Sequence, residues 1–220
     1  PDIFVLRGGW MGKFGRQPNS LIRNNGDGTF TDVTFDSGMV SYIPAQAATW
    51  NDFNNDGWLD VFIGNESNLQ DIYPCELYLN QKDGTFKNVA YAAGIDVIDY
   101  AKAVTSGDYD NDGWPDIFIS TMNRKSYLFR NKGAESGIMK FENVTDKAGL
   151  GNQVSKTFPT WFWDYDNDGW LDIFLCAYEF DKSLGYYEAA EKLNLSMPEE
   201  SKMKLYRNNH DGTFTNVADK

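Results

Sequence analysis

The sequence predicts an all-β fold built from repeated four-stranded antiparallel sheets, and three observations support this prediction. An acidic segment recurs at a constant spacing, at residues 52–60, 108–116 and 164–172. Short runs of aromatic and β-branched residues follow each copy, and Asp-Gly turns separate these runs. The same runs lack the 3.6-residue period that a helical repeat requires.

A second marker follows each acidic segment and completes each repeat unit. It reads Asp-Gly-Thr-Phe at residues 27–30, 83–86 and 211–214, whereas the third unit keeps only Phe-Glu-Asn-Val-Thr at 141–145. Four strands in about 50 residues is the size of a β-propeller blade. We therefore expect one partial β-propeller over residues 1–220, with units at approximately 1–39, 45–95, 101–150 and 157–220.

The two ends of the chain fall inside the repeat, and one unit carries an insertion. Residues 1–6 match residues 115–120, so the first unit is expected to lack its opening strand and most of its acidic segment. The segment 186–194 is rich in helix formers, which predicts a small helical insertion at approximately 181–203. The chain is thus interpreted as about four blades of a longer array.

The acidic segments have the residue types that bind Ca²⁺. This ion takes six to eight oxygen ligands, so carboxylates clustered on a tight loop suit it. In the pattern Asp-x-Asp/Asn-x-Asp-Gly-x-x-Asp, side chains at positions 1, 3, 5 and 9 and the carbonyl at position 7 are the expected ligands. Three complete Ca²⁺ sites are predicted, formed by Asp52, Asn54, Asp56, Trp58 and Asp60, by Asp108, Asp110, Asp112, Trp114 and Asp116, and by Asp164, Asp166, Asp168, Trp170 and Asp172.

Two alternative structures fit the acidic segments less well. An EF-hand needs an acidic residue at position 12 and flanking helices, but position 12 is Ile63, Ile119 or Leu175 within apolar strand runs. A simple hairpin turn accounts for one Asp and one Gly, not for four aligned oxygen-bearing side chains. A simple turn is favoured only for the Asp-Gly-Thr-Phe markers. Charge alone predicts the weakest Ca²⁺ binding at the first loop, where Asn54 replaces an aspartate.

Composition excludes several classes of protein. The formal net charge of −12 lacks the basic surface that nucleic-acid binding needs. Apolar runs such as Val61–Ile63 are too short to insert into a membrane. The single histidine, His210, lies in a turn, and Cys75 and Cys176 occupy non-equivalent positions, so neither a disulfide nor a zinc site is favoured. No residue set suits acid–base or nucleophilic catalysis, and we expect a protein that is not an enzyme.

The motifs resemble those of a known family. Gly-Asp-Tyr-Asp-Asn-Asp-Gly-Trp-Pro-Asp-Ile-Phe at 107–118 is similar to the FG-GAP/VCBS repeat, the calcium blade of integrin α-subunit propellers. The segments 5–10 and 19–30 more narrowly resemble bacterial relatives of cartilage acidic protein, which often carry an ASPIC/UnbV domain that is absent from these residues. The resemblance implies a seven- or eight-bladed propeller, an extracytoplasmic location (secreted, periplasmic or cell surface), and a role in adhesion or protein interaction.

Strand order indicates which face of the molecule could recognise a partner. In an up-and-down blade the acidic loop and the Asp-Gly-Thr-Phe turn lie on one face, so the second connection opens on the other. That connection varies in length, running between residues 2 and 21, 60 and 77, 116 and 128, and 172 and 205. We expect a protein or glycan ligand on this variable face, and contacts with the remainder of a longer chain.

Two alternatives to a protein-interaction scaffold stay open. The chain could be a carbohydrate-binding module or the propeller part of a polysaccharide lyase, with Trp161-Phe162-Trp163 as a sugar-stacking platform, although blade packing is the favoured role of these three residues. It could also be a purely structural subunit that binds nothing itself.

Overall fold

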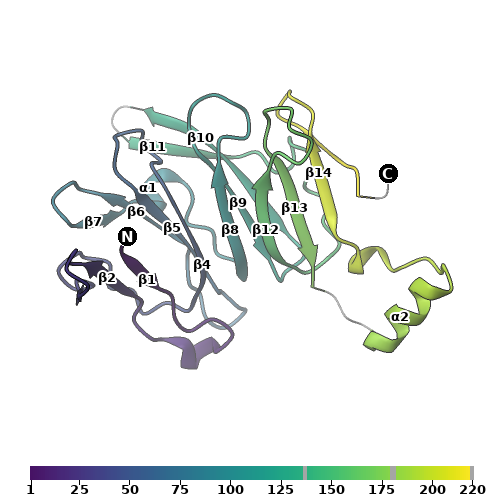
Figure 1. The fold of residues 1–220 in the computed structure, drawn as a ribbon, viewed down its shortest axis with the longest axis horizontal. Coiled ribbons are helices and arrows are strands. Elements are labelled where there is room, and N and C mark those ends of the chain that lie inside the picture. The colour runs from purple at the N-terminus through teal and green to yellow at the C-terminus, as the bar shows by residue number, and fades with distance from the viewer. Residues whose placement is uncertain (136–137, 179–181, 219–220) are drawn as a thin grey trace.

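The computed structural model describes residues 1–135, 138–178 and 182–218, and its regular structure is almost entirely β (Figure 1). Three four-stranded sheets and one three-stranded sheet, each antiparallel and each formed by consecutive strands, follow one another along the chain. The predicted all-β class with propeller-type blades is confirmed. The first residue of the predicted helical insertion, 181, and the last two residues of the fourth predicted unit, 219–220, lie outside the described residues.

The strands occur in the order that the repeat predicts. The first sheet has β1 (Ile3–Val5), β2 (Ser20–Asn24) and β3 (Phe30–Asp32), and the second has β4 (Ala45–Asn51), β5 (Asp60–Asn65), β6 (Glu76–Asn80) and β7 (Phe86–Asn88). The third has β8 (Ala101–Gly107), β9 (Asp116–Thr121), β10 (Ser126–Glu135) and β11 (Ile138–Asn143), and the fourth has β12 (Thr157–Trp163), β13 (Asp172–Ala177), β14 (Lys204–Asn208) and β15 (Phe214–Asn216).

Helical segments are few and short in the described part of the chain. They are η1 (Gly12–Gly15), α1 (Ala90–Ala93), α2 (Leu184–Lys192) and η2 (Glu199–Ser201). The α2 helix begins after Ser183, whose hydroxyl accepts a hydrogen bond from the Tyr186 N–H, and it buries only Ala190. It therefore stands away from the sheets, as Figure 1 shows at the lower right.

Sheets pack face to face through their first strands, with β4 against β8 and β8 against β12. The second strands are buried between neighbouring sheets, and Phe62 and Phe118 are fully buried there. Small residues allow this close approach. A Cβ atom on Gly107 would lie 2.6 Å from the end of the Leu171 side chain, which precedes β13 of the next sheet, so a larger residue would require that side chain to move.

The third sheet departs from the others where its unit lacks the Asp-Gly-Thr-Phe turn. Strand β10 is the longest strand in the described part of the chain, and its pairing with β11 shifts register between Asn131 and Ala134. Gly133 has a φ of +69°, and a Cβ there would lie 2.8 Å from the Trp114 ring. The bulge thus packs backbone directly against a tryptophan of the acidic loop, which only glycine permits.

Because each sheet is antiparallel and consecutive, its connections alternate between two ends. The acidic segments connect β4 to β5, β8 to β9 and β12 to β13 at one end, which we call the acidic-loop face. The connections β1–β2, β5–β6, β9–β10 and β13–β14 lie at the opposite end, the variable face, which also carries α2 (Figure 1). Within the described residues no helix has the length and apolar character needed to cross a membrane.

Candidate metal centres

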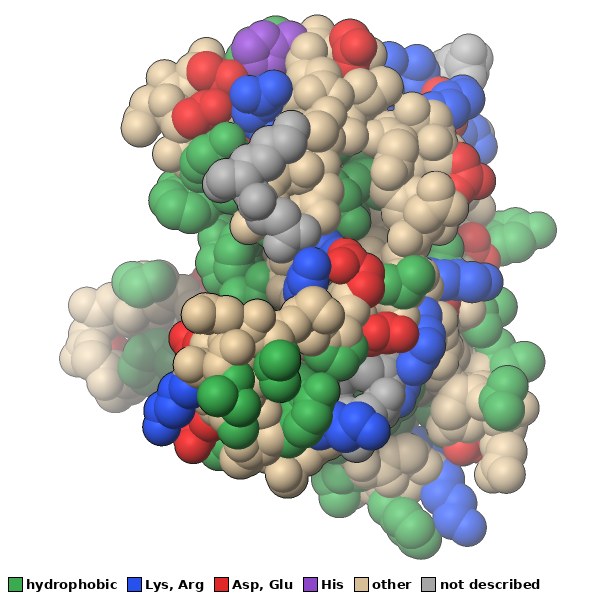
Figure 2. All heavy atoms as spheres, turned by 90° about the vertical axis from the view of Figure 1, so that its right-hand side faces the viewer, with side chains coloured by type: hydrophobic (Ala, Val, Ile, Leu, Met, Phe, Trp, Pro, Cys, Tyr) green, Lys and Arg blue, Asp and Glu red, His purple; other side chains and the backbone are tan. Residues whose placement is uncertain are grey.

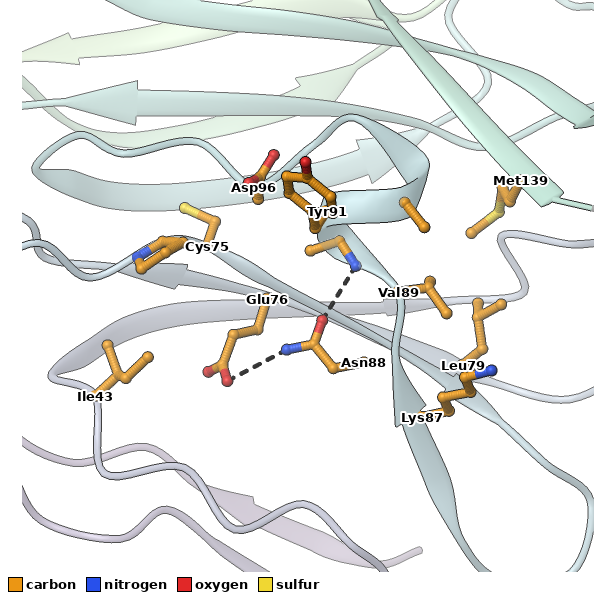
Figure 3. Close-up of a pocket in the computed structure, with 13 residues that line it drawn as sticks. Ile43, Cys75, Glu76, Leu79, Lys87, Asn88, Val89, Tyr91, Asp96 and Met139 are labelled. Atoms are coloured by element: carbon orange, nitrogen blue, oxygen red, sulfur yellow. Dashed lines mark hydrogen bonds between the residues drawn. The ribbon is translucent and has the colours of Figure 1, made fainter.

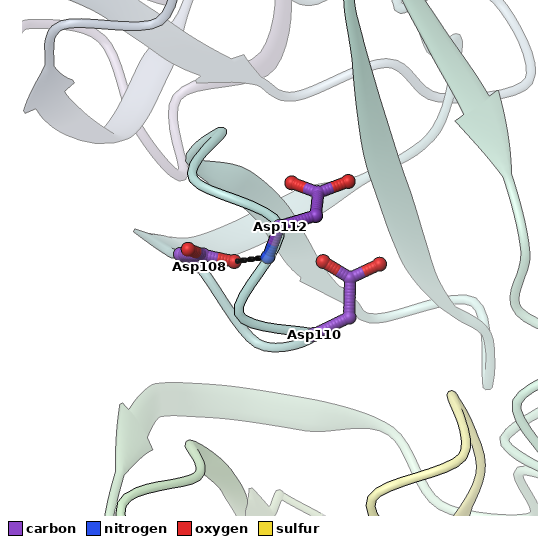
Figure 4. A group of neighbouring side chains, drawn as sticks. All are labelled: Asp108, Asp110 and Asp112. Atoms are coloured by element: carbon purple, nitrogen blue, oxygen red, sulfur yellow. Dashed lines mark hydrogen bonds between the residues drawn. The ribbon is translucent and has the colours of Figure 1, made fainter.

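The aspartate at position 1 fixes the shape of each acidic loop. In the second loop the two carboxylate oxygens of Asp108 accept hydrogen bonds from the backbone N–H groups of Asp112 (3.0 Å) and Gly113 (2.8 Å). Asp52 and Asp164 make the same pair of contacts in the first and third loops. The loops therefore have one common turn, which Figure 4 shows for Asp108, Asp110 and Asp112.

Two of the three loops gather carboxylates closely enough to hold one ion. Oxygens of Asp108, Asp110 and Asp112 lie within 4.8 Å of one another, and the same is true of Asp164, Asp166 and Asp172. In the first loop Asn54 takes the place of an aspartate, and its Nδ2 donates to Asp56 Oδ2 at 3.0 Å. The first loop thus has the same turn but one carboxylate fewer.

The aspartate at position 9 is completely buried in all three loops. Asp116 accepts hydrogen bonds on both oxygens, from the Tyr109 N–H (3.1 Å) and the Asn131 N–H (2.8 Å). Asp60 and Asp172 are held in the same way. Burial raises the pKa of Asp116 to about 8 and that of Asp60 to about 6. A buried carboxylate therefore lies at the base of each loop, and a bound cation would offset the free energy cost of ionising it.

The second and third acidic loops are each supported by an asparagine on the third strand of the same sheet. The acidic pattern alone does not predict this role for asparagine. Asn131 donates its backbone N–H to Asp116 and its Nδ2 to the carbonyl of Phe53 (2.8 Å) in the preceding loop. Asn208 repeats this arrangement, with its Nδ2 2.8 Å from the Tyr109 carbonyl. A signal is present in the sequence, because asparagine occurs at residues 24, 80, 131 and 208, close before each marker turn or its remnant. Asn131 and Asn208 connect the loop of one blade to the loop of the blade before it.

A second asparagine links neighbouring loops in the opposite direction. Asn55 at position 4 of the first loop donates to the Gly113 carbonyl of the second (2.8 Å), and Asn111 donates to the Gly169 carbonyl of the third (3.2 Å). Both have positive φ, which asparagine tolerates better than most residues. The three acidic loops thus form one hydrogen-bonded row.

Each acidic loop has a different basic neighbour on the third strand or third turn of its own sheet. Lys82 Nζ lies 3.3 Å from Asp56 in the first loop. Arg130 reaches Asp110 and Asp112 in the second. His210 Nε2 lies 2.7 Å from Asp168 in the third, and the imidazole stacks on the Trp170 ring with centroids 4.7 Å apart. The electrostatic setting of the three loops therefore differs although their turns are alike.

The donor groups suit a hard divalent cation. The side-chain ligands expected in each loop are all carboxylate or amide oxygens, which Ca²⁺ prefers. Asp110 Oδ1 is buried and has no hydrogen-bond partner among the described residues, which leaves one oxygen available inside the loop. The backbone N–H groups of Trp58, Trp114 and Trp170 each donate a hydrogen bond to the carboxylate at position 5 of the same loop. These bonds orient the aspartate side chain.

The two cysteines lie away from the acidic loops. Both are free thiols. Cys75 lines a hollow of about 710 Å³ beside α1, together with Glu76, Asn88 and Asp96 (Figure 3). Asn88 accepts a hydrogen bond from the Ala90 N–H and donates one to Glu76. None of the described residues that line this hollow belongs to an acidic loop, and the lining is mainly apolar.

The tryptophans of β12 lie in a different environment from the phenylalanine between them. Phe162 packs against Phe118 of the neighbouring sheet, with ring centroids 6.4 Å apart. Trp161 and Trp163 are 41% and 51% exposed. Figure 2 views the molecule from the side where the fourth sheet and α2 lie, and hydrophobic side chains are scattered over this side. Blade packing therefore accounts for Phe162 but not fully for its two neighbours.

The fold and the acidic loops define a class of repeat protein. FG-GAP-like repeats match residues 1–63, 52–119 and 108–175, which together cover most of the chain. The chain belongs to the FG-GAP-like repeat family. The second and third matches each run from one acidic loop into the strand that follows the next loop, in agreement with the spacing of the loops.

The chain is also similar to cartilage acidic proteins. It is 27% identical to cartilage acidic protein 1 of Xenopus tropicalis and 28% identical to that of Homo sapiens, in each case over 173 residues and 72% of this chain. The Mus musculus protein of the same name is also 27% identical. The chain spans about a quarter of the length of these relatives.

Proposed function

We propose that this chain is a calcium-binding part of a β-propeller that acts as a non-catalytic, extracytoplasmic scaffold for molecular interactions. The observation that carries the proposal is the row of three acidic loops, each closed by a fully buried aspartate that forms no ion pair within the described part of the chain. A buried carboxylate that has hydrogen bonds but no ion pair is still costly to ionise, and a divalent ion held by the same loop offsets that cost.

Three Ca²⁺ ions would each be held by positions 1, 3, 5 and 9 and by the carbonyl of the tryptophan at position 7. They would change the formal net charge of −12 to −6. At millimolar Ca²⁺ and a Kd of ~0.1–1 mM, the range of extracellular calcium modules, each ion would stabilise the fold by roughly 0.4–1.4 kcal/mol. Because the loops are hydrogen-bonded in a row, binding at one is expected to order the next.

The acidic-loop face is proposed as the scaffold and the variable face as the recognition surface. Connections on the variable face differ in length and include α2, whereas the acidic loops keep one turn. Variable connections on a constant framework are where binding surfaces usually lie. A secreted, periplasmic or cell-surface location provides the calcium that this role needs, and the similarity to cartilage acidic proteins supports it. The four sheets would then be part of a seven- or eight-bladed ring.

Chelation tests the metal proposal directly. Thermal unfolding of the purified chain in calcium and in excess EDTA should differ, with a lower melting temperature after chelation. Terbium emission sensitised by Trp58, Trp114 and Trp170 should appear on titration and be displaced by Ca²⁺. An unchanged melting temperature together with no bound metal in the purified protein would exclude the proposal.

A further inference from the structure

The first strands of three sheets share an irregularity at the end that points to the variable face. The register of β4 on β5 shifts between Ala45 and Ala47, and that of β8 on β9 shifts between Ala101 and Ala103. Strand β12 shifts on β13 between residues 157 and 160. A β-bulge redirects a side chain out of the regular alternation, and bulges are frequent beside binding sites. The residues inside the three shifts are Gln46, Lys102 and Phe158 with Pro159.

Trp10, from the β1–β2 connection, contacts two of these bulged residues, Lys102 and Phe158. Its ring centroid is 3.1 Å from Lys102 Nζ and 5.8 Å from the centroid of Phe158. The adjoining Gly9 lies directly against Gln46, since a Cβ atom at Gly9 would be 2.4 Å from Gln46 Oε1. Gly9 and Trp10 of the β1–β2 connection therefore contact the first strands of the second, third and fourth sheets.

A buried ion pair holds Trp10 in place from beneath. Lys102 and Glu66 form an ion pair with side chains 0% and 1% exposed. Glu66 Oε2 also accepts a hydrogen bond from the backbone N–H of Trp10 at 2.6 Å. Lys102 Nζ lies 4.2 Å from the centroid of Tyr100. The two charges neutralise each other below the aromatic rings, so the surface above them offers no free charge from this pair.

Despite these contacts, the aromatic rings are open to solvent. Trp10 is 49% exposed and Tyr178 is 42% exposed, with ring centroids 6.0 Å apart. The rings of Tyr100 and Phe158 complete the cluster at 6.2 and 5.8 Å from Trp10. Half-exposed aromatic rings that are held in place have little side-chain entropy left to lose, which favours ligand binding.

We propose that the Trp10–Tyr100–Phe158–Tyr178 cluster is a binding site for a neutral saccharide. The C–H faces of a pyranose ring stack on aromatic rings, and Trp10 and Tyr178 are the rings of the cluster that are about half exposed. The pairing of Lys102 with Glu66 favours an uncharged ligand over an acidic or basic one. This proposal rests on the role of the variable face as the recognition surface, but it needs no metal, because the cluster lies at the opposite end of the sheets from the acidic loops.

The proposal can be tested with neutral xylo-, cello-, manno- and chito-oligosaccharides as probes, with heparin and polygalacturonate as acidic comparators. Binding is measured in excess calcium by saturation-transfer NMR and by titration of tryptophan fluorescence. Tyr178→Ala should weaken binding about tenfold, the size of one aromatic contact, and Trp10→Ala should abolish it. Trp161→Ala is the matched control, because Trp161 is similarly exposed (41%) but is not one of the rings of the cluster.

Several outcomes would overturn the saccharide site. They are binding by acidic glycans alone, loss of binding in Trp161→Ala with Tyr178→Ala unaffected, and no binding by any neutral probe. If circular dichroism shows that Trp10→Ala fails to fold, Trp10→Phe replaces it and should weaken binding, since the smaller ring keeps only part of the contact. The chelation-dependent melting shift is measured separately, so failure of the calcium proposal and failure of the saccharide site give different results.

Discussion

The Nε atom of Arg130 lies 2.6 Å from Asp110 Oδ2, which places a guanidinium group against position 3 of the second acidic loop. The Nη2 atom of the same side chain lies 2.8 Å from Asp112 Oδ2 at position 5. Arg130 therefore neutralises two of the four carboxylates that a metal ion in this loop would use. The second loop thus has a permanently charged cation paired with its aspartates.

Arg130→Gln should raise the calcium affinity of the second loop by roughly two- to fivefold, the value of a partly exposed ion pair. The variant should also melt lower than the wild type in EDTA, because the aspartates then repel one another without compensation. Isothermal titration with Ca²⁺ and melting curves at both calcium levels measure the two effects. Arg23→Gln is the matched control, since Arg23 holds the same place in the first sheet, which has no complete acidic loop. An affinity of the second loop that does not rise in Arg130→Gln would contradict this role of Arg130.

Asn54→Asp should give the first loop the carboxylate that the other two already have. The change removes the hydrogen bond from Asn54 Nδ2 to Asp56 Oδ2 and places a further charge beside the aspartates of the loop. We expect calcium affinity at this loop to rise about tenfold, because ligand charge is one of the properties that set affinity in calcium loops, and the melting temperature in EDTA to fall. Asn25→Asp, in an exposed turn of the first sheet, controls for the added charge. Equal calcium affinity in Asn54→Asp and wild type would show that the charge at position 3 does not set the affinity of this loop.

Much of this architecture could be predicted because it depends on local chemistry. The strands and turns follow from aromatic and β-branched runs and from Asp-Gly pairs, and the acidic loops follow from their fixed spacing. The turn-forming role expected of Asp27 agrees with its hydrogen bond from the Thr29 N–H. The links between sheets could not be predicted in this way. The contact of Asn131 with Phe53, like that of Trp10 with Lys102, depends on which residues the packing of separate sheets brings together, and no local pattern specifies that.

Asn131→Ala should destabilise the fold by about 1–3 kcal/mol, because it leaves the buried carbonyl of Phe53 without its donor. The loss should appear as a lower midpoint in urea unfolding with an unchanged slope. Asn80→Ala is the matched control. The side chain of Asn80 donates to the carbonyl of Leu59 and accepts from the N–H of Lys82, as that of Asn131 does with the equivalent residues of its own sheet. These contacts of Asn80 are exposed and stay within its own sheet. Equal losses in the two variants would mean that the link between the second and third sheets contributes nothing to stability.

The two free thiols should react very differently with a thiol reagent. Burial raises the pKa of Cys75 to about 12, so its reactive thiolate is only about one part in ten thousand at pH 8. Cys176 is half-buried at the end of β13, where burial also raises its pKa but solvent still reaches the residue. With Ellman's reagent at pH 8, the absorbance change of the native protein should therefore correspond to one reactive thiol. After unfolding in guanidinium it should correspond to two.

Cys176→Ser identifies which thiol reacts. The native variant should show almost no reaction, whereas the unfolded variant should show one thiol, and raising the pH toward 10 should speed the labelling of Cys75 before unfolding begins. Cys75→Ser should instead keep the fast native reaction. Rapid labelling of native Cys176→Ser at pH 8 would mean that the hollow beside α1 opens to solvent often enough to expose Cys75, and that this part of the second sheet is less stable than its burial indicates.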